Sequence, residues 1–150
     1  MALNYSVRML NVRIRRLHQS VPLPEYQTDG AAAFDLAAAT DVRVAPGEMA
    51  LVPTGLVIEV PAGLFLAIFA RSSTPLKRGL VIPNGVGIVD SDYCGPDDEI
   101  KIQVLNITSE PVQVKRGDRI AQGILMQFAA PEWEEGEPAD KTRGGFGSTG

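Results

Sequence analysis

Short apolar runs separated by turn residues dominate the middle of the chain. The clearest run is EIKIQVL (99–105), in which Ile100, Ile102 and Val104 alternate with polar residues. This period of two is typical of a strand with one buried face. The other apolar runs lie at 49–60, 63–70, 80–82, 85–90 and 119–128. Turn signals such as Pro-Gly and Pro-Asn-Gly recur between them, which predicts an all-β sandwich or barrel.

Three local features refine this pattern. Asn84-Gly85 lies between two apolar runs and is the strongest short hairpin signal in the chain. AAAFDLAAAT (31–40) has the helix propensity of alanine, but its flanking turns and its length argue against a helix. TPLKRG (74–79) fits one helical turn, and no segment keeps a helical period for three turns.

The pattern divides the chain into a β-barrel domain, residues 1–130, and a C-terminal arm, residues 131–150. The arm lacks periodicity and is rich in Gly, Pro and acidic residues, so on composition alone it is disordered. The alternative is an arm that becomes ordered over a phosphate-bearing ligand. Phe146 among glycines and the hydroxyl groups of Ser148 and Thr149 favour this alternative.

Composition narrows the class of protein. A chain of 150 residues suits one domain with a hydrophobic core. Apolar runs fall well short of the roughly 20 residues of a membrane span, and arginines interrupt the N-terminal segment where a secretory signal is apolar. The single cysteine, Cys94, suits a reducing compartment. We therefore expect a cytoplasmic protein with no membrane partner.

Charge points to a small ligand. The net charge of −4 disfavours a broad contact with nucleic acid, so no nucleic-acid partner is expected. Lysines and arginines recur beside the predicted turns, which suits a small anionic ligand.

Several familiar site patterns fail. The GVG segment at 85–87 lacks a third glycine, and the C-terminal glycines precede no helix, which excludes a dinucleotide fingerprint and a P-loop. The DSD segment at 90–92 begins like a calcium loop, but Cys94 and Lys101 stand where oxygen ligands are required. His18 has no second candidate metal ligand beside it, so we expect it on the surface.

The remaining polar residues gather where predicted strands end. Each has a structural explanation: a bulge or edge for Asp35, a turn for Ser72 and Ser73, an Asx turn for Asp90, and the solvent face of a strand for Gln122. Their order and spacing together favour a functional site.

Five segments, taken in order, resemble the motifs of the trimeric dUTP diphosphatase (dUTPase) family. They are AAFDLAA around Asp35, ARSST (70–74), NGVGIVDSDYCG (84–95), RGDRIAQ (116–122) and GGFGSTG (144–150). The resemblance spans nearly the whole chain, and its third and fifth segments are the most specific. It implies a distorted jelly-roll-like β-barrel of the β-clip type with a flexible Gly-rich C-terminal arm. It also implies a homotrimer in which each active site draws residues from three chains.

The resemblance implies Mg²⁺-dependent hydrolysis of dUTP to dUMP and pyrophosphate, which keeps uracil out of DNA and supplies dUMP for dTMP synthesis. Asp90 matches the catalytic base, which activates a water for attack on the α-phosphorus, whereas Asp92 is expected to be a turn acid. Tyr93 matches the residue that packs on deoxyribose and leaves no room for a 2′-hydroxyl. Asp35 matches an acid that helps to hold magnesium through its waters.

The other implied contacts are with the substrate. They are Asn84 and the backbone that includes Gly87 and Val89 for the uracil edge; Arg71, Ser72, Ser73 and Gln122 for the phosphates; and, from the arm, Lys141 or Arg143 for the γ-phosphate, Phe146 over the uracil, and Gly147, Ser148 and Thr149 near the phosphates.

The sequence departs from the family pattern in a few places. Ala33, Ala70 and Thr74 stand where glycine, proline and glycine are usual, and Pro96-Asp97-Asp98 looks like an insertion. Lys141 stands at the usual position of an arginine, and lysine is the weaker bidentate clamp.

Two other functions compete with this interpretation. A dCTP deaminase shares the fold, but its catalytic glutamate falls at Gln103 and a further arginine at Leu76, and an amide cannot act as acid or base. A nucleotide-sensing or partner-binding module of the same fold would not need Asp90, Tyr93 and Phe146 together.

Overall fold

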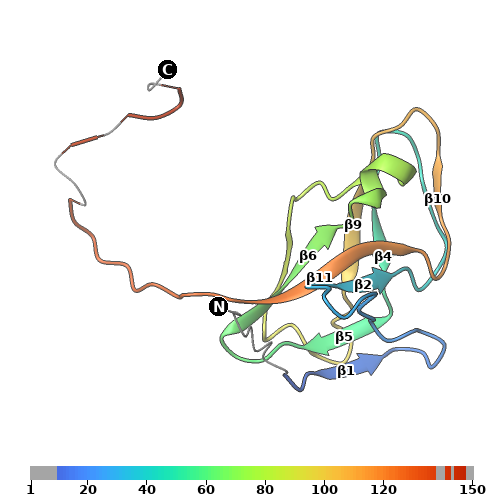
Figure 1. Cartoon of the computed structure of the whole chain (residues 1–150), viewed down its shortest axis with the longest axis horizontal. Coiled ribbons are helices and arrows are strands. Elements are labelled where there is room, and N and C mark those ends of the chain that lie inside the picture. The colour runs from blue at the N-terminus through green and yellow to red at the C-terminus, as the bar shows by residue number, and fades with distance from the viewer. Residues whose placement is uncertain (1–9, 138–140, 143, 148–150) are drawn as a thin grey trace, which may run out of the picture.

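The computed structural model describes residues 10–137, 141–142 and 144–147, and these residues are almost entirely strands and turns (Figure 1). The strands are β1 Arg13–Arg16, β2 Phe34–Ala37, β3 Val42–Val44, β4 Met49–Pro53, β5 Leu56–Glu59, β6 Leu64–Ala70, β7 Leu80–Val81, β8 Gly87–Val89, β9 Lys101–Asn106, β10 Val112–Val114 and β11 Arg119–Gln127. A single helical turn, η1 Thr74–Arg78, follows β6. Within the described residues, no helix is long and apolar enough to span a membrane.

The strands form four small antiparallel sheets that curve around one interior (Figure 1). Their orders are β2-β11-β6-β8, β4-β9-β7, β1-β5 and β3-β10. After β11 the chain leaves the barrel as an extended segment. The predicted all-β, jelly-roll-like class is confirmed.

The core follows the apolar alternation of the sequence. In β9, Ile102 and Val104 are buried whereas Lys101 is exposed, as the period of two predicted. Leu36 and Leu66 from the larger sheet face the same interior and are fully buried. Each such side chain stabilises the fold by about 1.5–3 kcal/mol through the removal of apolar surface from water.

Two further local predictions are confirmed. The alanine-rich segment 31–40 contains a strand, β2, because Leu36 enters the core and the backbone of β2 pairs with β11. TPLKRG forms the single turn η1 and ends at Gly79, which adopts a left-handed conformation with φ of 64°.

The predicted Asn84-Gly85 hairpin is wrong. The strands on either side of it belong to different sheets, because β7 pairs with β9 and β8 pairs with β6. A turn does form, in which the Gly85 N–H donates to the Ile82 carbonyl at 3.0 Å. Its central residues are Pro83 and Asn84. Proline suits the first central position because its fixed φ matches the one that a turn requires there. The turn therefore carries the chain from one sheet to the other.

Candidate functional site

Asp35, Arg71 and Arg119 form a charged cluster on three neighbouring strands. Asp35 lies in β2, Arg119 begins β11, and Arg71 follows β6. Arg71 Nε lies 2.8 Å from Asp35 Oδ1, and Arg119 Nη1 lies 3.2 Å from Asp35 Oδ2. The Asp35 side chain is only 10% exposed, and burial of a carboxylate is costly unless it is paired. Two guanidinium groups satisfy it and leave the cluster with a net positive charge.

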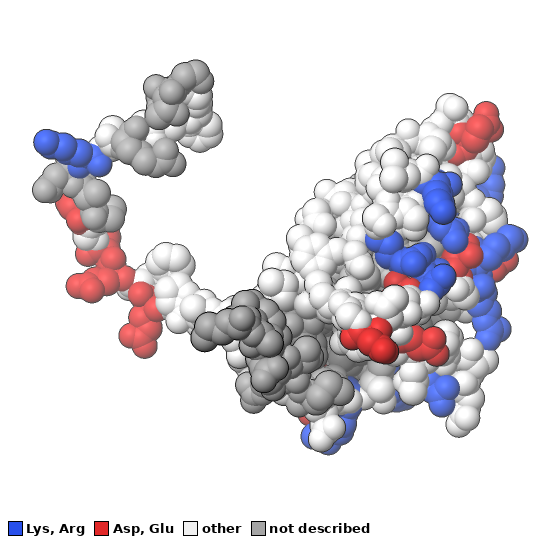
Figure 2. All heavy atoms as spheres, in the orientation of Figure 1, with Lys and Arg blue, Asp and Glu red and all other residues white. Residues whose placement is uncertain are grey.

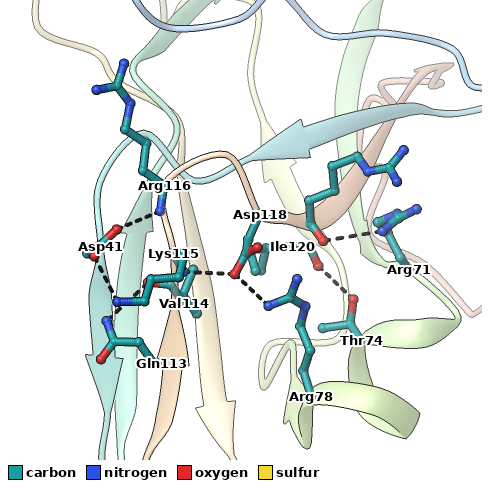
Figure 3. Close-up of polar contacts among 11 residues, drawn as sticks. Asp41, Arg71, Thr74, Arg78, Gln113, Val114, Lys115, Arg116, Asp118 and Ile120 are labelled. Atoms are coloured by element: carbon teal, nitrogen blue, oxygen red, sulfur yellow. Dashed lines mark hydrogen bonds and ion pairs between the residues drawn. The ribbon is translucent and has the colours of Figure 1, made fainter.

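Part of the Arg71 guanidinium remains available to a ligand. Its Nε contacts Asp35. Its Nη1 donates to the Arg119 carbonyl at 3.4 Å, the dashed line that reaches Arg71 in Figure 3. Gln122 lies beside it, and its Nε2 donates to the Ala70 carbonyl at 3.0 Å. Ser72 follows and is exposed. The cluster therefore combines cations with N–H and O–H groups, which is the donor set that phosphate oxygens require.

A second set of contacts holds η1 against the start of β11 (Figure 3). The buried Thr74 donates from Oγ1 to the Ile120 carbonyl at 2.9 Å, and Arg78 Nη1 lies 2.7 Å from Asp118 Oδ2. The hydrogen bond from Arg78 lowers the pKa of Asp118 below its usual value, and the N–H of Lys115 adds to this effect. These contacts fix the segment that follows Arg71 and the residues on both sides of Arg119.

The turn that precedes β11 is also fixed by Asp41. The Arg116 backbone N–H donates to Asp41 Oδ1 at 2.8 Å, and Lys115 Nζ contacts Asp41 Oδ2 at 3.3 Å. The backbone hydrogen bond is the larger cause of the lowered pKa of Asp41, and the lysine contributes as well. The position of Arg119, which follows this turn, is therefore set by the fold.

Positive charge gathers around this region of the surface. Figure 2 shows lysine and arginine side chains, with acids among them, over η1 and the start of β11. A surface of this kind attracts a polyanionic ligand. The described part of the arm carries the opposite charge, in Glu132, Glu134, Glu135 and Glu137.

Asp90 and Tyr93 lie together in a second place, an open cleft of about 440 Å³. Asp90 directly follows β8 and is exposed. The Tyr93 N–H donates to the Asp90 carbonyl at 3.2 Å, so one tight turn sets both side chains. The Tyr93 hydroxyl donates to the Glu99 carbonyl at 3.1 Å. The cleft thus combines an exposed carboxylate with a fixed aromatic ring.

The residues predicted as an insertion, 96–98, form a closed loop beside this cleft. Asp98 accepts a hydrogen bond from the Gly95 N–H at 2.7 Å and returns one from its own N–H to the Gly95 carbonyl at 3.2 Å. The Glu99 carboxylate accepts a bond from the turn between β4 and β5 at 2.8 Å. This loop and the Gly55–Glu99 hydrogen bond lie directly beside the carbonyl that holds the Tyr93 hydroxyl.

The described chain does not bring these two clusters together. In the order β2-β11-β6-β8, the strands that carry Asp35 and precede Asp90 are opposite edges, about 14 Å apart at the usual strand spacing. The strand register separates them further. Across the sheet, Asp35 is level with Phe69 of β6, whereas Val89 is level with Leu66, three residues along the same strand. This offset adds about 10 Å of separation parallel to the strands. One chain therefore carries two separate halves of the predicted site.

The predicted uracil-reading residues lie on the Asp90 side. Asn84 is exposed at the centre of its turn, and Gly87 and Val89 are the ends of β8. β8 is an outer strand of its sheet, so one row of its N–H and C=O groups is not used by β6. A Cβ at Gly87 would lie 3.1 Å from Ile68 Cβ, so a side chain there is disfavoured.

The arm residues are only partly described. Lys141, Phe146 and Gly147 are exposed, and Phe146 has a φ of 50°. Arg143, Ser148 and Thr149 lie outside the described residues.

Several residues that support the first cluster were not predicted from the sequence. Arg78 and Asp118 carry no ligand-binding signal of their own, although Asp118 lies within the RGDRIAQ segment. Gln27, which accepts a hydrogen bond from Arg119, lies in a loop outside every motif. His18, in contrast, is exposed, as predicted.

Comparison with known proteins points to one family. The family model described as dUTPase matches residues 19–150. The chain is 39% identical over 147 residues to the deoxyuridine 5'-triphosphate nucleotidohydrolase of Lactococcus lactis, covering 96% of this chain and 98% of that one. It is 45% identical over 141 residues to the protein of the same name from Desulfitobacterium hafniense, covering 90% and 91%. The crystal structure of dUTPase from Streptococcus mutans superposes with a TM-score of 0.75 at 33% identity, over 83% of this chain and 100% of that one.

Proposed function

Because this chain belongs to the dUTPase family, a family of dUTP diphosphatases, we propose that it hydrolyses dUTP to dUMP and pyrophosphate. The observation that carries the proposal is the cleft that holds Asp90 and Tyr93, two residues of the third motif. Its surroundings supply an exposed carboxylate and a fixed ring beside an open sheet edge. Together these are the groups that a base-selective nucleotide hydrolase needs.

Asp90 acts as the general base. Its carboxylate takes a proton from a water as the water oxygen attacks the α-phosphorus, and the bond from that phosphorus to the bridging oxygen breaks. Pyrophosphate leaves and dUMP remains. A single carboxylate suffices, because positioning and electrostatics supply most of the catalysis of phosphoryl transfer.

Selection for a deoxyribonucleotide with uracil rests on the same cleft. The Tyr93 ring, held through its hydroxyl by the Glu99 carbonyl, packs on the deoxyribose and excludes a 2′-hydroxyl. Asn84 and the backbone of β8 at Gly87 and Val89 read the uracil edge. Thymine and cytosine are rejected because they clash or leave buried polar groups unpaired.

The first cluster takes the phosphates. The free N–H groups of Arg71, the hydroxyls of Ser72 and Ser73, and the Gln122 side chain contact phosphate oxygens. Asp35 and the Arg119 carbonyl orient Arg71 for this role by engaging its Nε and Nη1.

The Asp35 carboxylate also fits a role in holding Mg²⁺ through water molecules. Among the described residues, no three carboxylate, histidine or cysteine side chains form a protein cage for a metal. Mg²⁺ commonly keeps several waters and binds one or two carboxylates together with substrate phosphates. Asp35 suits this role, since two arginines engage its oxygens and leave further lone pairs for water. When bound, the ion neutralises charge on the phosphates.

The separation of the two clusters supports a shared active site. Asp90 and Arg71 serve one substrate only if they come from different copies of the chain, in a homotrimer. The arm of the third copy then covers the substrate, with Phe146 over the uracil and Gly147 near the phosphates. Lys141 or Arg143 takes the γ-phosphate, and Ser148 and Thr149 also lie near the phosphates.

The reaction gives the protein its place in nucleotide metabolism. Removal of dUTP keeps uracil out of DNA, and dUMP is the precursor for dTMP synthesis. We place this activity in the cytoplasm.

The test is a panel of dUTP, dTTP, dCTP and UTP, assayed for pyrophosphate with Mg²⁺ and again with a chelator. We expect Mg²⁺-dependent release from dUTP and almost none from the other three. Equal turnover of all four would contradict the specificity. Release of ammonia from dCTP would instead support the deaminase alternative, which Gln103 argues against because an amide cannot replace the catalytic glutamate of that family.

A further inference from the structure

The Arg119 guanidinium lies between two acceptors. Its Nη1 contacts Asp35 Oδ2 at 3.2 Å and also donates to the side-chain oxygen of Gln27. Gln27 comes from the loop between β1 and β2, outside all five predicted motifs. This contact therefore adds a residue to the phosphate-binding cluster that the motifs do not contain.

The loop that carries Gln27 is fixed to the sheet. The Asp35 N–H donates to the Glu25 carbonyl at 3.0 Å and forms an isolated bridge with that residue. The rings of Tyr26 and Phe34 pack edge to face with centroids 5.9 Å apart. Gln27 follows directly after these two contacts. Its side chain therefore approaches Arg119 from a defined position.

Arg119 needs this second acceptor to stay in place. Its side chain is 47% exposed, and an exposed ion pair to one carboxylate is too weak to fix a long side chain. Gln27 adds a second acceptor for Arg119. Because its side chain is neutral, it does not replace Asp35 as the ion-pair partner of Arg119. Arg119 then holds one oxygen of Asp35 while Arg71 holds the other at 2.8 Å. Both oxygens are fixed, so the plane of the carboxylate is fixed too.

We propose that Gln27 is a positioning residue, which holds Arg119 on Asp35 and so orients the Asp35 carboxylate toward the phosphates and the waters of their metal ion. The identity of that ligand rests on the proposed function. The hold of Gln27 on Arg119 does not, because it is a property of the protein without ligand.

The first experiment measures this hold in the ligand-free protein. Gln27→Met keeps the size of the side chain and removes the acceptor. We expect rotation of the Arg119 guanidinium about its Nε–Cζ bond, measured by ¹⁵N and ¹³C NMR, to become several-fold faster. Gln19→Met is the matched control, since Gln19 is exposed and its contact within the described residues is through the backbone carbonyl. An unchanged rotation rate in Gln27→Met would overturn the proposal.

The second experiment measures the consequence for binding. With Mg²⁺ present, we expect Gln27→Met to weaken binding of the non-hydrolysable α,β-imido analogue of dUTP by roughly three- to tenfold in calorimetry, the effect of one hydrogen bond. Binding of dUMP should be unchanged, because dUMP lacks the outer phosphates. Gln27→Glu keeps an acceptor of the same length and should restore the slow rotation of the Arg119 guanidinium in the ligand-free protein.

The outcomes separate the two proposals. Equal loss of analogue and dUMP binding, or a lowered melting temperature, would overturn a positioning role in favour of a general structural one. Failure of the wild type to bind either nucleotide would contradict the proposed function. The rotation rate would then still decide whether Gln27 holds Arg119.

Discussion

Asp90 and Asp92 are two residues apart, and both are exposed. Only Asp90 directly follows the buried end of β8 and lines the cleft with Tyr93. We expect Asp90→Asn to retain binding of the dUTP analogue but to lose about 10²–10⁴-fold in kcat, because the amide cannot accept the proton from water. Asp92→Asn is the matched control and should keep most of the activity in the pyrophosphate assay. Full activity of Asp90→Asn would remove Asp90 as the base.

The protonation of Asp118 is expected to change the free energy of unfolding. Its side chain is 25% exposed, and the hydrogen bond from Arg78 lowers its pKa below the usual 3.8. A lowered pKa in the folded state means that Asp118 stabilises the fold above the unfolded-state pKa. This contribution is lost as the pH falls through the folded-state pKa.

We therefore expect Asp118→Asn to lower the free energy of unfolding by about 1 kcal/mol near neutral pH. The difference from the wild type should be smaller at an acidic pH below the lowered folded-state pKa of Asp118, where the wild-type carboxyl is also neutral. Urea titrations at both pH values measure the two differences. Asp97→Asn, at an exposed position, is the control. A difference that stays constant with pH would rule out the ion pair with Arg78 as its cause.

At the scale of an element, Gly79 fixes the end of η1 and the direction of β7. Its φ is 64°, and a Cβ there would lie 2.0 Å from Thr108 Cγ2. Gly63 has a similar φ of 79° but open space around it. We expect Gly63→Ala to cost about 1 kcal/mol in unfolding free energy from backbone strain alone. Gly79→Ala should cost roughly 1–3 kcal/mol more because of the collision.

A double variant separates the two causes. Thr108→Ser removes Cγ2 and keeps the hydroxyl that contacts Asn106 and Glu110 at 2.8 Å. Added to Gly79→Ala, it should recover the collision part and leave a cost like that of Gly63→Ala. Equal stabilities of the single and double Gly79 variants, measured by urea unfolding, would show that Thr108 is not the obstacle.

The elements that could be predicted were those whose periodicity reflects burial on one face. β9 was clear because Ile102 and Val104 alternate with exposed or half-buried residues. β1 was missed because it offers a single apolar residue, Ile14, among arginines, and owes its strand to pairing with β5. The hairpin at Asn84 was wrong because a local turn signal does not encode which strands pair across the barrel.

At the scale of the molecule, the motifs predict a set of site residues but not how these residues are distributed over the fold. Asp35, Arg71 and Gln122 were expected at one site and do lie on adjacent strands. Asp90 is on the far edge of that sheet. The order of motifs along a sequence does not say which copy of the chain supplies each residue of a site. The contact of Gln27 with Arg119 could not be predicted either, because it joins residues that are distant in sequence.

This distribution can be tested by mixing two inactive variants. Asp90→Asn keeps an intact phosphate cluster, whereas Arg71→Ala keeps an intact Asp90 cleft. Suppose that each site takes Asp90 from one copy and Arg71 from another. A site is then active when the first copy is the Arg71→Ala variant and the second is the Asp90→Asn variant. Equal amounts refolded together should therefore restore roughly a quarter of the wild-type rate of dUTP hydrolysis. The same variants mixed without refolding should stay inactive if their subunits do not exchange. A refolded mixture no more active than the mean of the separate variants would show that each chain works alone, and would require the two clusters to approach each other within one chain.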